Sequence, residues 1–558
     1  PTATTSTAEK CTALGVTALD SITTGDNITA IGYEAGTAVT TGNNLTLIGT
    51  DAGVALQNGY SCVFIGGNTG MAAVSSTNNT AIGSAAFANN VHGKYNVAIG
   101  DNAMGAGVGP GSATSTYNVA IGCDAGKDMT TGVRNTMVGH SAAGNIESAN
   151  DTVAIGYDAG DDLTSGSSNV LIGAYAGDKT TTGNNNISIG YESLHTNIDG
   201  DSIVAIGYRA FKTLEPADGN AHNVAVGHEA AEAATTSTYG TFIGSQAGKA
   251  VTTGTYNAAL GAQAMLLTNV GQYNTALGAQ ALYSNVDGSL STAVGYKALY
   301  AQDPASAVDL FNVAVGANAG LATTIGQYNT FIGGEAGKTN IDGNAGVAVG
   351  YKALFAQEPA SNVDTDNTAV GFEAGVAVST GLRNTLIGNN TAAALTTGNS
   401  NIIVGSTSNV SASGAENQVV IGYNTTAASN NSVVLGNTDT TIWHPADDNG
   451  VDLGSQTYSF KDAYIQGSLK IGDTSGSTYF QFPATTGTAG QLLKVPSSGN
   501  VLEWGTGTGV DHFADTGAET LLVGHSNGPS GTANMNTGVG RKALAALTEG
   551  DNNAALGN

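Results

Sequence analysis

The sequence predicts an all-β protein, a parallel β-solenoid or β-roll built from turns of 17 residues. The phrase "NTAIG" at 79–83 returns as "NVAIG" at 96–100, and the same pattern continues along most of the 558 residues. Its centre is β-branched and flanked by Asn and Gly, which favours a short strand. Gly accounts for 80 residues and charged residues for only 11%, which is unlike an ordinary globular domain. With only 9 Pro, collagen and a disordered linker are also disfavoured.

The repeat is numbered here from the residue before the recurring glycine, which is called position 0. The spacing is seventeen residues except for four longer steps, to Ile121, Val226, Val315 and Val370, and a final step of fourteen. Stacked turns lie about 4.8 Å apart, so twenty-five turns predict a rod of roughly 120 Å. Position 0 is occupied by Leu14, Ile31, Ile48, Ile65, Ile82, Ile99, Ile121, Val138, Ile155, Ile172, Ile189, Ile206, Val226, Ile243, Leu260, Leu277, Val294, Val315, Ile332, Val349, Val370, Ile387, Val404, Ile421 and Leu435.

Both faces of each predicted strand are apolar. Positions 0 and −2 point to one side, and position −1, which is mostly Ala, points to the other. A thin coil has a single interior, so we expect the second apolar row to meet another chain. The expected assembly is a homotrimer wound about the rod axis. A single turn does not offset its own backbone entropy, so stability is expected to come from stacking.

Glycine and asparagine occupy fixed places in the repeat. The glycine after position 0 and the glycine of "TTG" are expected at corners that need a positive φ or a close backbone approach. Asn stands at position −3 in fourteen units. We expect a turn residue there, with a hydrogen-bonded ladder of stacked amides as the alternative. Cys11 and Cys62 share this column three turns apart, about 14 Å, which excludes an intrachain disulfide between them.

Charge excludes two classes of partner. The net charge is −26 with 17 basic residues spread thinly, so no basic stripe is available for nucleic acid or an anionic bilayer. The sequence contains no run of eighteen apolar residues, so we do not expect it to insert into a membrane. Three cysteines are too few to indicate a compartment.

Three regions are predicted along the chain. Residues 1–436 form the repeat shaft, and 437–514 form a non-repeat neck or linker that contains both tryptophans. Residues 515–558 begin a second array, with position 0 at Val523, Val539 and Leu556, which looks truncated. The longer steps insert segments such as "KTLEPADGN", which we interpret as loops on one face.

Two phrases carry a family resemblance. The N-T/V-A-I-G-x-x-A units resemble the N-S-V-A-I-G units in heads of trimeric autotransporter adhesins, which are left-handed parallel β-rolls; "NSVVLG" at 431–436 matches most closely. Arrays of this period are also similar to those in long tail fibres of bacteriophages. The segments "DLGSQTYSFKDAYIQGSLKIGD" and "TAGQLLKVPSSGNVLEWG" are similar to linkers near the distal end of such fibres. The chaperone and virion-attachment domains of such fibres are not recognisable in this sequence.

No catalytic, cofactor-binding or metal site is expected. Acids recur at position +3, and those on adjacent turns, such as Glu34 and Asp51, are expected about 5 Å apart, as in a retaining glycosidase. A solvated face explains them better, with calcium binding as a weaker option. His140, His228 and His525 share position +2 on units far apart, and we expect none of them to have a second ligand at metal spacing. The other acids of the column are Asp124, Asp158, Glu192, Glu229, Glu335 and Glu373.

Tyrosines form the one candidate binding site. Tyr239, Tyr256 and Tyr273 stand at position −4 on three successive turns, so their rings are expected to align in one column. Aromatic rings stack on sugars, which predicts glycan contact there; packing between the rings is the alternative.

The sequence and the resemblance together imply a non-enzymatic tail fibre shaft of a phage virion. Its expected partners are its own copies, other virion proteins and a host cell-surface glycan or protein. A bacterial trimeric surface adhesin head is the alternative, and a polysaccharide-degrading tailspike is a distant third. The expected location is extracellular, on a virion or on a bacterial surface.

Overall fold

The computed structural model describes residues 6–105, 114–216, 219–359 and 361–443, with residues 457, 460–462 and 464 and six short strands beyond them. The chain divides into two compact units, Pro1–Thr440 and Thr441–Asn558. All regular structure in the described residues is β-strand. Among those residues, none belongs to a helix with the length and apolar character needed to cross a membrane.

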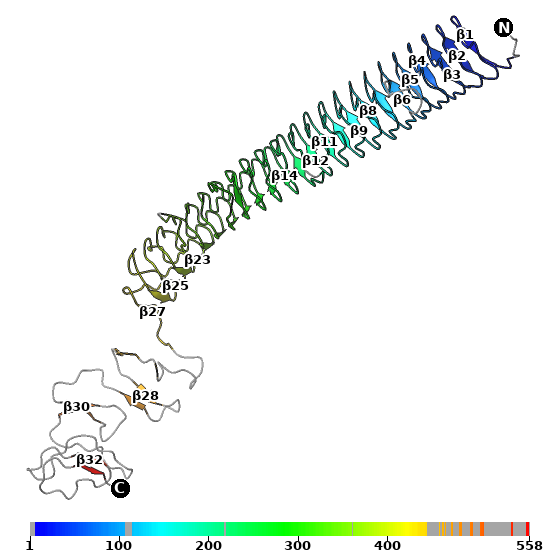
Figure 1. Ribbon diagram of the computed structural model, residues 1–558. Helices are drawn as coiled ribbons and strands as arrows, with labels where there is room; N and C mark the ends of the chain where they lie inside the picture. Colours follow the sequence, from blue (N-terminus) through cyan, green and yellow to red (C-terminus); the bar gives the residue numbers. More distant parts are fainter. Residues whose placement is uncertain are drawn as a thin grey trace, which may run out of the picture. The chain divides into compact units, whose positions relative to one another are not determined.

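The first unit is a parallel β-solenoid, which confirms the predicted fold class. Twenty-five of its strands form one sheet in which each strand pairs in parallel with the next turn (Figure 1). Thr80 pairs with Val97 and Ile82 with Ile99, so equivalent repeat positions lie in register. Twenty-four steps of about 4.8 Å give the stack a length of roughly 115 Å.

The strands of this unit are short and end at position 0 in every turn of the main sheet. They are β1 (Thr12–Leu14), β2 (Ile28–Ile31), β3 (Leu45–Ile48), β4 (Val63–Ile65), β5 (Thr80–Ile82), β6 (Val97–Ile99), β7 (Val119–Ile121), β8 (Thr136–Val138), β9 (Val153–Ile155), β10 (Val170–Ile172), β11 (Ile187–Ile189), β12 (Val204–Ile206), β13 (Val224–Val226), β14 (Thr241–Ile243), β15 (Ala258–Leu260), β16 (Thr275–Leu277), β17 (Gly288–Ser289), β18 (Thr292–Val294), β19 (Val308–Asp309), β20 (Val313–Val315), β21 (Thr330–Ile332), β22 (Val347–Val349), β23 (Thr368–Val370), β24 (Thr385–Ile387), β25 (Ile402–Val404), β26 (Val419–Ile421) and β27 (Val433–Leu435).

The longer steps leave the register intact. Ile99 pairs with Ile121 across the longest step, and Val294 pairs with Val315 across another, so the extra residues are accommodated between strands. Within the second of these steps, β19 pairs in parallel with β17 and adds a small separate ladder. The parallel register of the sheet is therefore kept in every turn, and the inserted residues lie between its strands.

The interior of the solenoid is formed by position −1. Phe64, Phe242 and Phe331 are fully buried there, and Ala fills most of the other turns. The side chains at position 0 lie on the opposite face of the same strands, where Ile82 keeps 37% and Ile332 40% of its surface exposed. The structure thus confirms two apolar faces and shows that only one of them is covered within the chain.

A column of glycines after position 0 permits the close stacking of turns. Gly83 has φ +136°, and a Cβ atom added there would lie 2.3 Å from the carbonyl oxygen of Gly100 on the next turn. An L-residue would meet both a backbone clash and an unfavourable φ. This confirms the predicted structural role of the column.

The asparagines at position −3 form a buried ladder, so the turn-residue interpretation was wrong. All fourteen are at most 1% exposed. The Oδ1 atom of Asn79 accepts the backbone N–H of Asn96 at 2.9 Å, and its amide donates to the carbonyl of Gly93 at 2.7 Å. Each side chain thereby bridges two turns with bonds that are not exposed to water.

Cys11 and Cys62 are both free, as expected from their separation. Cys62 is buried in the asparagine column, and its thiol donates to the carbonyl of Ser76 at 3.4 Å, in the place of an Asn amide. Burial raises the pKa of the Cys62 thiol. It is therefore a packing residue of the ladder.

In the second unit the structure describes three strand pairs. β28 (Lys470–Gly472) pairs antiparallel with β29 (Tyr479–Gln481), and β30 (Gln491–Lys494) with β31 (Glu503–Thr506). β32 (Thr537–Val539) pairs in parallel with β33 (Ala554–Leu556) in the register of the 17-residue repeat. Val523, His525 and most of the predicted neck lie outside the described residues, and the three-region division stays a prediction.

Replacing Asn96 by Ala tests the buried ladder. The change leaves the N–H of Asn118 without its acceptor, 2.9 Å away in the native structure, and removes one of the two donors to the Ser115 carbonyl, which keeps the N–H of Lys94. We expect a loss of about 2–4 kcal/mol in the free energy of unfolding, because buried unpaired backbone groups are costly. Urea denaturation of the full chain followed by circular dichroism measures it. The control is Asn389→Ala, at an exposed position +2, which is expected to change stability by less than about 0.5 kcal/mol. Equal losses in both variants would contradict the ladder's role.

Candidate functional site

The three predicted tyrosines align in one column. The ring centroids of Tyr239 and Tyr256 are 4.9 Å apart with planes 1° from parallel, and those of Tyr256 and Tyr273 are 5.0 Å and 5° apart. The His222 ring stacks below Tyr239 at 5.3 Å. Each tyrosine has a φ of 55–56°, because position −4 is a left-handed corner of the turn. This confirms the turn assignment in this part of the chain.

Ring stacking decides which parts of the tyrosine side chains remain exposed to solvent. The faces of Tyr256 are covered by its two neighbours, and about half of each tyrosine remains exposed. The available surface therefore consists of ring edges and hydroxyl groups. Beyond Tyr273, a shallow depression of about 330 Å³ lies next to the insertion that carries β19; its lining residues are Gln272, Tyr273, Ser289, Leu290, Ala307, Val308 and Asp309.

Other aromatic residues repeat the arrangement at positions −4 and +2. Tyr95 and Tyr117 stack at 4.9 Å, and Tyr191 and Tyr208 at 5.6 Å. Stacked aromatic pairs contribute about 0.5–1.5 kcal/mol each beyond their burial. Ring packing alone therefore gives these columns a structural role.

The acids at position +3 are in part neutralised by neighbouring cations. The Nζ atom of Lys249 lies 2.6 Å from the carboxylate of Glu229, and that of Lys338 lies 2.7 Å from Glu335. These hydrogen bonds lower the pKa of both carboxyl groups. A general acid needs the opposite shift, because it must hold its proton near neutral pH.

Glu34 and Asp51 lie at this same corner on adjacent turns, after β2 and β3. The backbone N–H of Asp51 donates to the carbonyl of Tyr33, and Asp51 Oδ1 is buried without a hydrogen-bond partner. A hydrogen bond with Glu34, together with the charges of Glu34 and Asp51, raises the pKa of the Tyr33 hydroxyl. The structure thus places the two acids at equivalent positions of adjacent turns, and their expected separation of about 5 Å stays a prediction.

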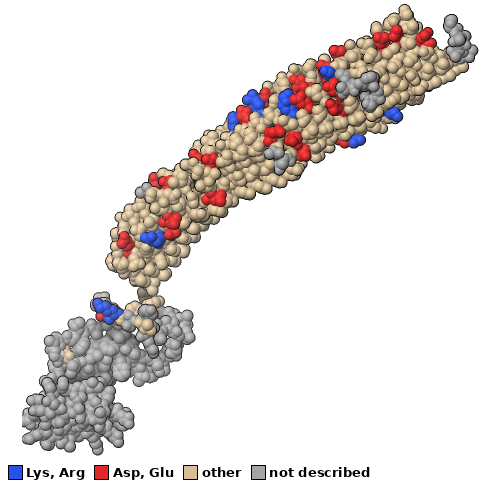
Figure 2. Space-filling model, viewed as in Figure 1, with Lys and Arg blue, Asp and Glu red and all other residues tan. Residues whose placement is uncertain are grey.

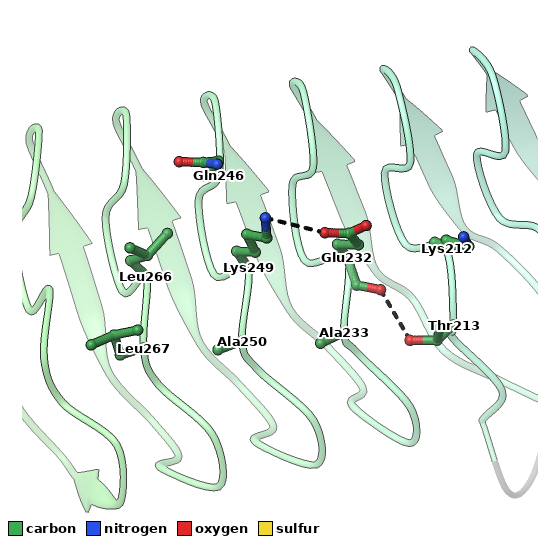
Figure 3. Close-up of a pocket in the computed structure, with 9 residues that line it drawn as sticks. All are labelled: Lys212, Thr213, Glu232, Ala233, Gln246, Lys249, Ala250, Leu266 and Leu267. Atoms are coloured by element: carbon green, nitrogen blue, oxygen red, sulfur yellow. Dashed lines mark hydrogen bonds and ion pairs between the residues drawn. The ribbon is translucent and has the colours of Figure 1, made fainter.

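Charged residues gather on the middle of the shaft, while most of the visible face is uncharged (Figure 2). Position +6 places Lys212, Glu232, Lys249 and Leu266 on four successive turns (Figure 3). Lys249 Nζ is 3.4 Å from the Glu232 carboxylate, and the Thr213 hydroxyl donates to the Glu232 carbonyl at 3.0 Å. These residues line a shallow depression of about 560 Å³ whose cations are already paired.

His140 has potential metal ligands beside it, which the sequence analysis missed. Cys123 occupies position +2 on the turn before, directly in register, and Asp124 follows it. One ligand atom from each of the three residues lies within 4.8 Å of the others. The expectation that His140 has no second ligand is therefore wrong, because a solenoid brings together residues one period apart.

Asp161 has the most displaced carboxyl pKa in the described part of the shaft. Partial burial, followed by the charges of Asp158, Asp162 and Asp178, raises its pKa to about 6. Lys179 opposes this shift. The group therefore changes charge just below neutral pH.

The fold defines this chain as a β-solenoid repeat protein. No model of a known protein family matches the sequence, and a search of curated proteins finds no similar one.

Replacing Asp161 by Asn tests the acidic cluster. The folded-state pKa is raised, so the fold binds this proton more tightly than the unfolded chain and loses stability as pH rises from about 4 to 6. Asp161→Asn is expected to stabilise the protein by about 1 kcal/mol at pH 7.5, after allowing for solvent screening, and to have no benefit at pH 4. Urea unfolding of both proteins at the two pH values measures the difference. Asp162→Asn, which removes a partner 3.0 Å from Lys179, is the control and is expected to give no gain. A gain independent of pH would contradict the assignment.

Proposed function

We propose that this chain is the shaft of a homotrimeric fibre that extends a receptor-binding tip from a phage virion towards its host. The observation that carries the proposal is the uncovered apolar face of the 25-stranded sheet. A long in-register solenoid supplies a stiff spacer, and this face supplies a way to join several such spacers side by side.

The uncovered face is continuous and uncharged. Positions 0 and −2 carry only Ile, Val, Leu, Thr and one Ala in the shaft. A stable interface buries roughly 800 Å² per partner, so a stripe of 24 steps needs only roughly 33 Å² per turn. Residues at position 0 that remain more than a third exposed are Leu14, Ile82, Ile121, Ile155, Leu260, Leu277, Val315, Ile332, Val370, Ile387, Ile421 and Leu435.

A second copy of the chain is the occupant that fits this face. Any copy presents the same row at the same spacing of about 4.8 Å, so parallel chains match along their whole length. An exposed apolar patch of this extent is typical of an interaction surface. Three chains around a common axis cover all three stripes at once, which is the homotrimer expected from the second apolar row of the sequence.

The mass of the native assembly tests the proposal. Three chains of 55.3 kDa give about 166 kDa, which light scattering coupled to size-exclusion chromatography measures. Replacing Leu260, Ile332, Ile387 and Ile421 by Glu puts charge on the stripe and is expected to yield monomers. The control is Leu267→Glu, at a residue 43% exposed at position +7, away from the stripe, which is expected to leave the trimer intact. A monomeric native chain would contradict the proposal.

Two other functions share this fold. A bacterial trimeric adhesin head uses the same kind of repeat, and the genes beside the coding sequence separate it from a fibre: virion genes favour the fibre, a membrane-anchor barrel the adhesin. Virion proteins are the proposed neighbours of the fibre, and a host glycan or protein is its proposed target. The exposed edges of Tyr239, Tyr256 and Tyr273, with the depression beside Tyr273, are the proposed glycan contact.

A polysaccharide-degrading tailspike is tested by incubation with purified capsular polysaccharide or lipopolysaccharide. The fibre proposal expects no released oligosaccharide by mass spectrometry. In line with this, the lysines beside Glu229 and Glu335 lower the pKa of both carboxyl groups, which disfavours a general acid at those two turns. Release of fragments that is abolished in a variant with Glu34→Gln and Asp51→Asn would instead favour the tailspike.

A further inference from the structure

Three side chains with metal-binding chemistry meet at one corner of the shaft. Cys123 and Asp124 follow β7, and His140 follows β8 at the position equivalent to Cys123. The parallel register of Ile121 with Val138 fixes the two turns against each other. The thiol sulfur, a carboxylate oxygen and an imidazole nitrogen all lie within 4.8 Å of one another. Cys123 and Asp124 are half-buried, and His140 is exposed.

We propose that Cys123, Asp124 and His140 bind a divalent transition metal ion of the zinc class. Thiolate, imidazole and carboxylate are the ligands that Zn²⁺ takes in proteins, at about 2.0–2.3 Å. Tetrahedral ligands at those distances lie roughly 3.3–3.8 Å apart. Side-chain rotations that move the ligand atoms by about 1 Å are therefore enough to form the site. The thiolate and imidazole select against calcium and magnesium, which prefer oxygen ligands.

A fourth ligand is available from a neighbouring turn or from water. Asp158 Oδ1, on the turn after His140, lies 3.7 Å from His140 Nδ1. On the other side, Asp101 occupies position +2 on the turn before Cys123. Three carboxylates thus surround the thiol and the imidazole along four turns.

The charge at this corner favours a bound cation. Asp124 accepts a hydrogen bond from the Asn102 amide at 2.8 Å and lies 3.5 Å from the Cys123 thiol. Within the described residues, Asp101, Asp124 and Asp158 form no ion pair with Lys or Arg. Partial burial and then the Asp124 charge raise the pKa of the Cys123 thiol. A metal ion reverses this effect, because it stabilises the thiolate and neutralises the carboxylates.

His228 provides a matched corner without the thiol. It also stands at position +2 and is followed by an acid, Glu229, whose carboxylate is 3.7 Å from its ring. Lys249 already occupies that carboxylate at 2.6 Å. The same fold therefore presents one corner whose acids form no ion pair with Lys or Arg in the described residues, and one corner where a lysine takes the place of a cation.

The position of the site suggests its role in the shaft. It lies on the two turns that follow the longest step of the array, from Ile99 to Ile121. A metal held by both turns joins them side chain to side chain, in addition to the backbone bonds of β7 and β8. Because it binds the folded state, such an ion stabilises this part of the solenoid.

Cobalt binding to the full chain tests the site. After treatment with EDTA and dialysis, titration with Co²⁺ is expected to give a thiolate-to-cobalt absorption band in the near ultraviolet that saturates at one ion per chain. Cys123→Ser is expected to abolish the band, and His140→Gln to weaken binding tenfold or more. His228→Gln and Cys11→Ser are the controls and are expected to bind like the native chain. A missing band, or a band retained in Cys123→Ser, would overturn the proposal.

A second measurement does not depend on how the variants fold. In the native chain, Zn²⁺ alone is expected to slow alkylation of Cys123 by iodoacetamide about tenfold, as read from peptide masses. Cys11, which is exposed and far from any such cluster, serves as the internal reference. Equal alkylation of Cys123 with and without Zn²⁺ would contradict metal binding.

Discussion

The backbone hydrogen bonds between equivalent residues of successive turns are the constraint on which the whole structure depends. A strand of three residues has almost no stability by itself, because ordering its backbone costs about 1–2 kcal/mol per residue. In register, each turn supplies the donors and acceptors that the next one needs, and position −1 closes an interior of Ala with occasional Phe, Leu and Met. Stability is therefore a property of neighbouring turns, as in other repeat proteins.

This register converts the sequence into columns, and each column has its own chemistry. Glycines stack where a Cβ atom would strike the next turn, and asparagines bond to each other's backbone inside the coil. Aromatic rings stack at the corners, and Ile, Val and Leu form the outer stripe. A spacer, an association surface and a metal site then arise from the same geometry, because residues one period apart always become neighbours.

The strands of the 25-stranded sheet could be predicted from the sequence, since each one covers positions −2 to 0 of the repeat, and so could the tyrosine column. Other features could not. Tyr256 and Glu229 adopt left-handed φ values of 56° and 53°, which local propensity assigns to Gly or Asn; the stacked turn imposes them. Asn96 was expected to be a turn residue. Its burial could not be predicted from the local sequence, because the turns above and below are what cover it. The sequence did not predict that Cys123 and His140 are neighbours, because their contact depends on the parallel register. Their shared position +2 was the feature that could have indicated it.

The distance between two labelled turns tests the account most directly. Ser245 and Asn389 are both exposed at position +2, after β14 and β24, eight steps apart in the sheet. Spin labels on cysteines introduced there, in a chain whose native cysteines are Ser and diluted with unlabelled chain, allow a dipolar measurement. In-register stacking predicts a single narrow distance of roughly 38 Å between these sites. A broad distribution, or a distance that does not match eight steps, would contradict the stacked-turn account.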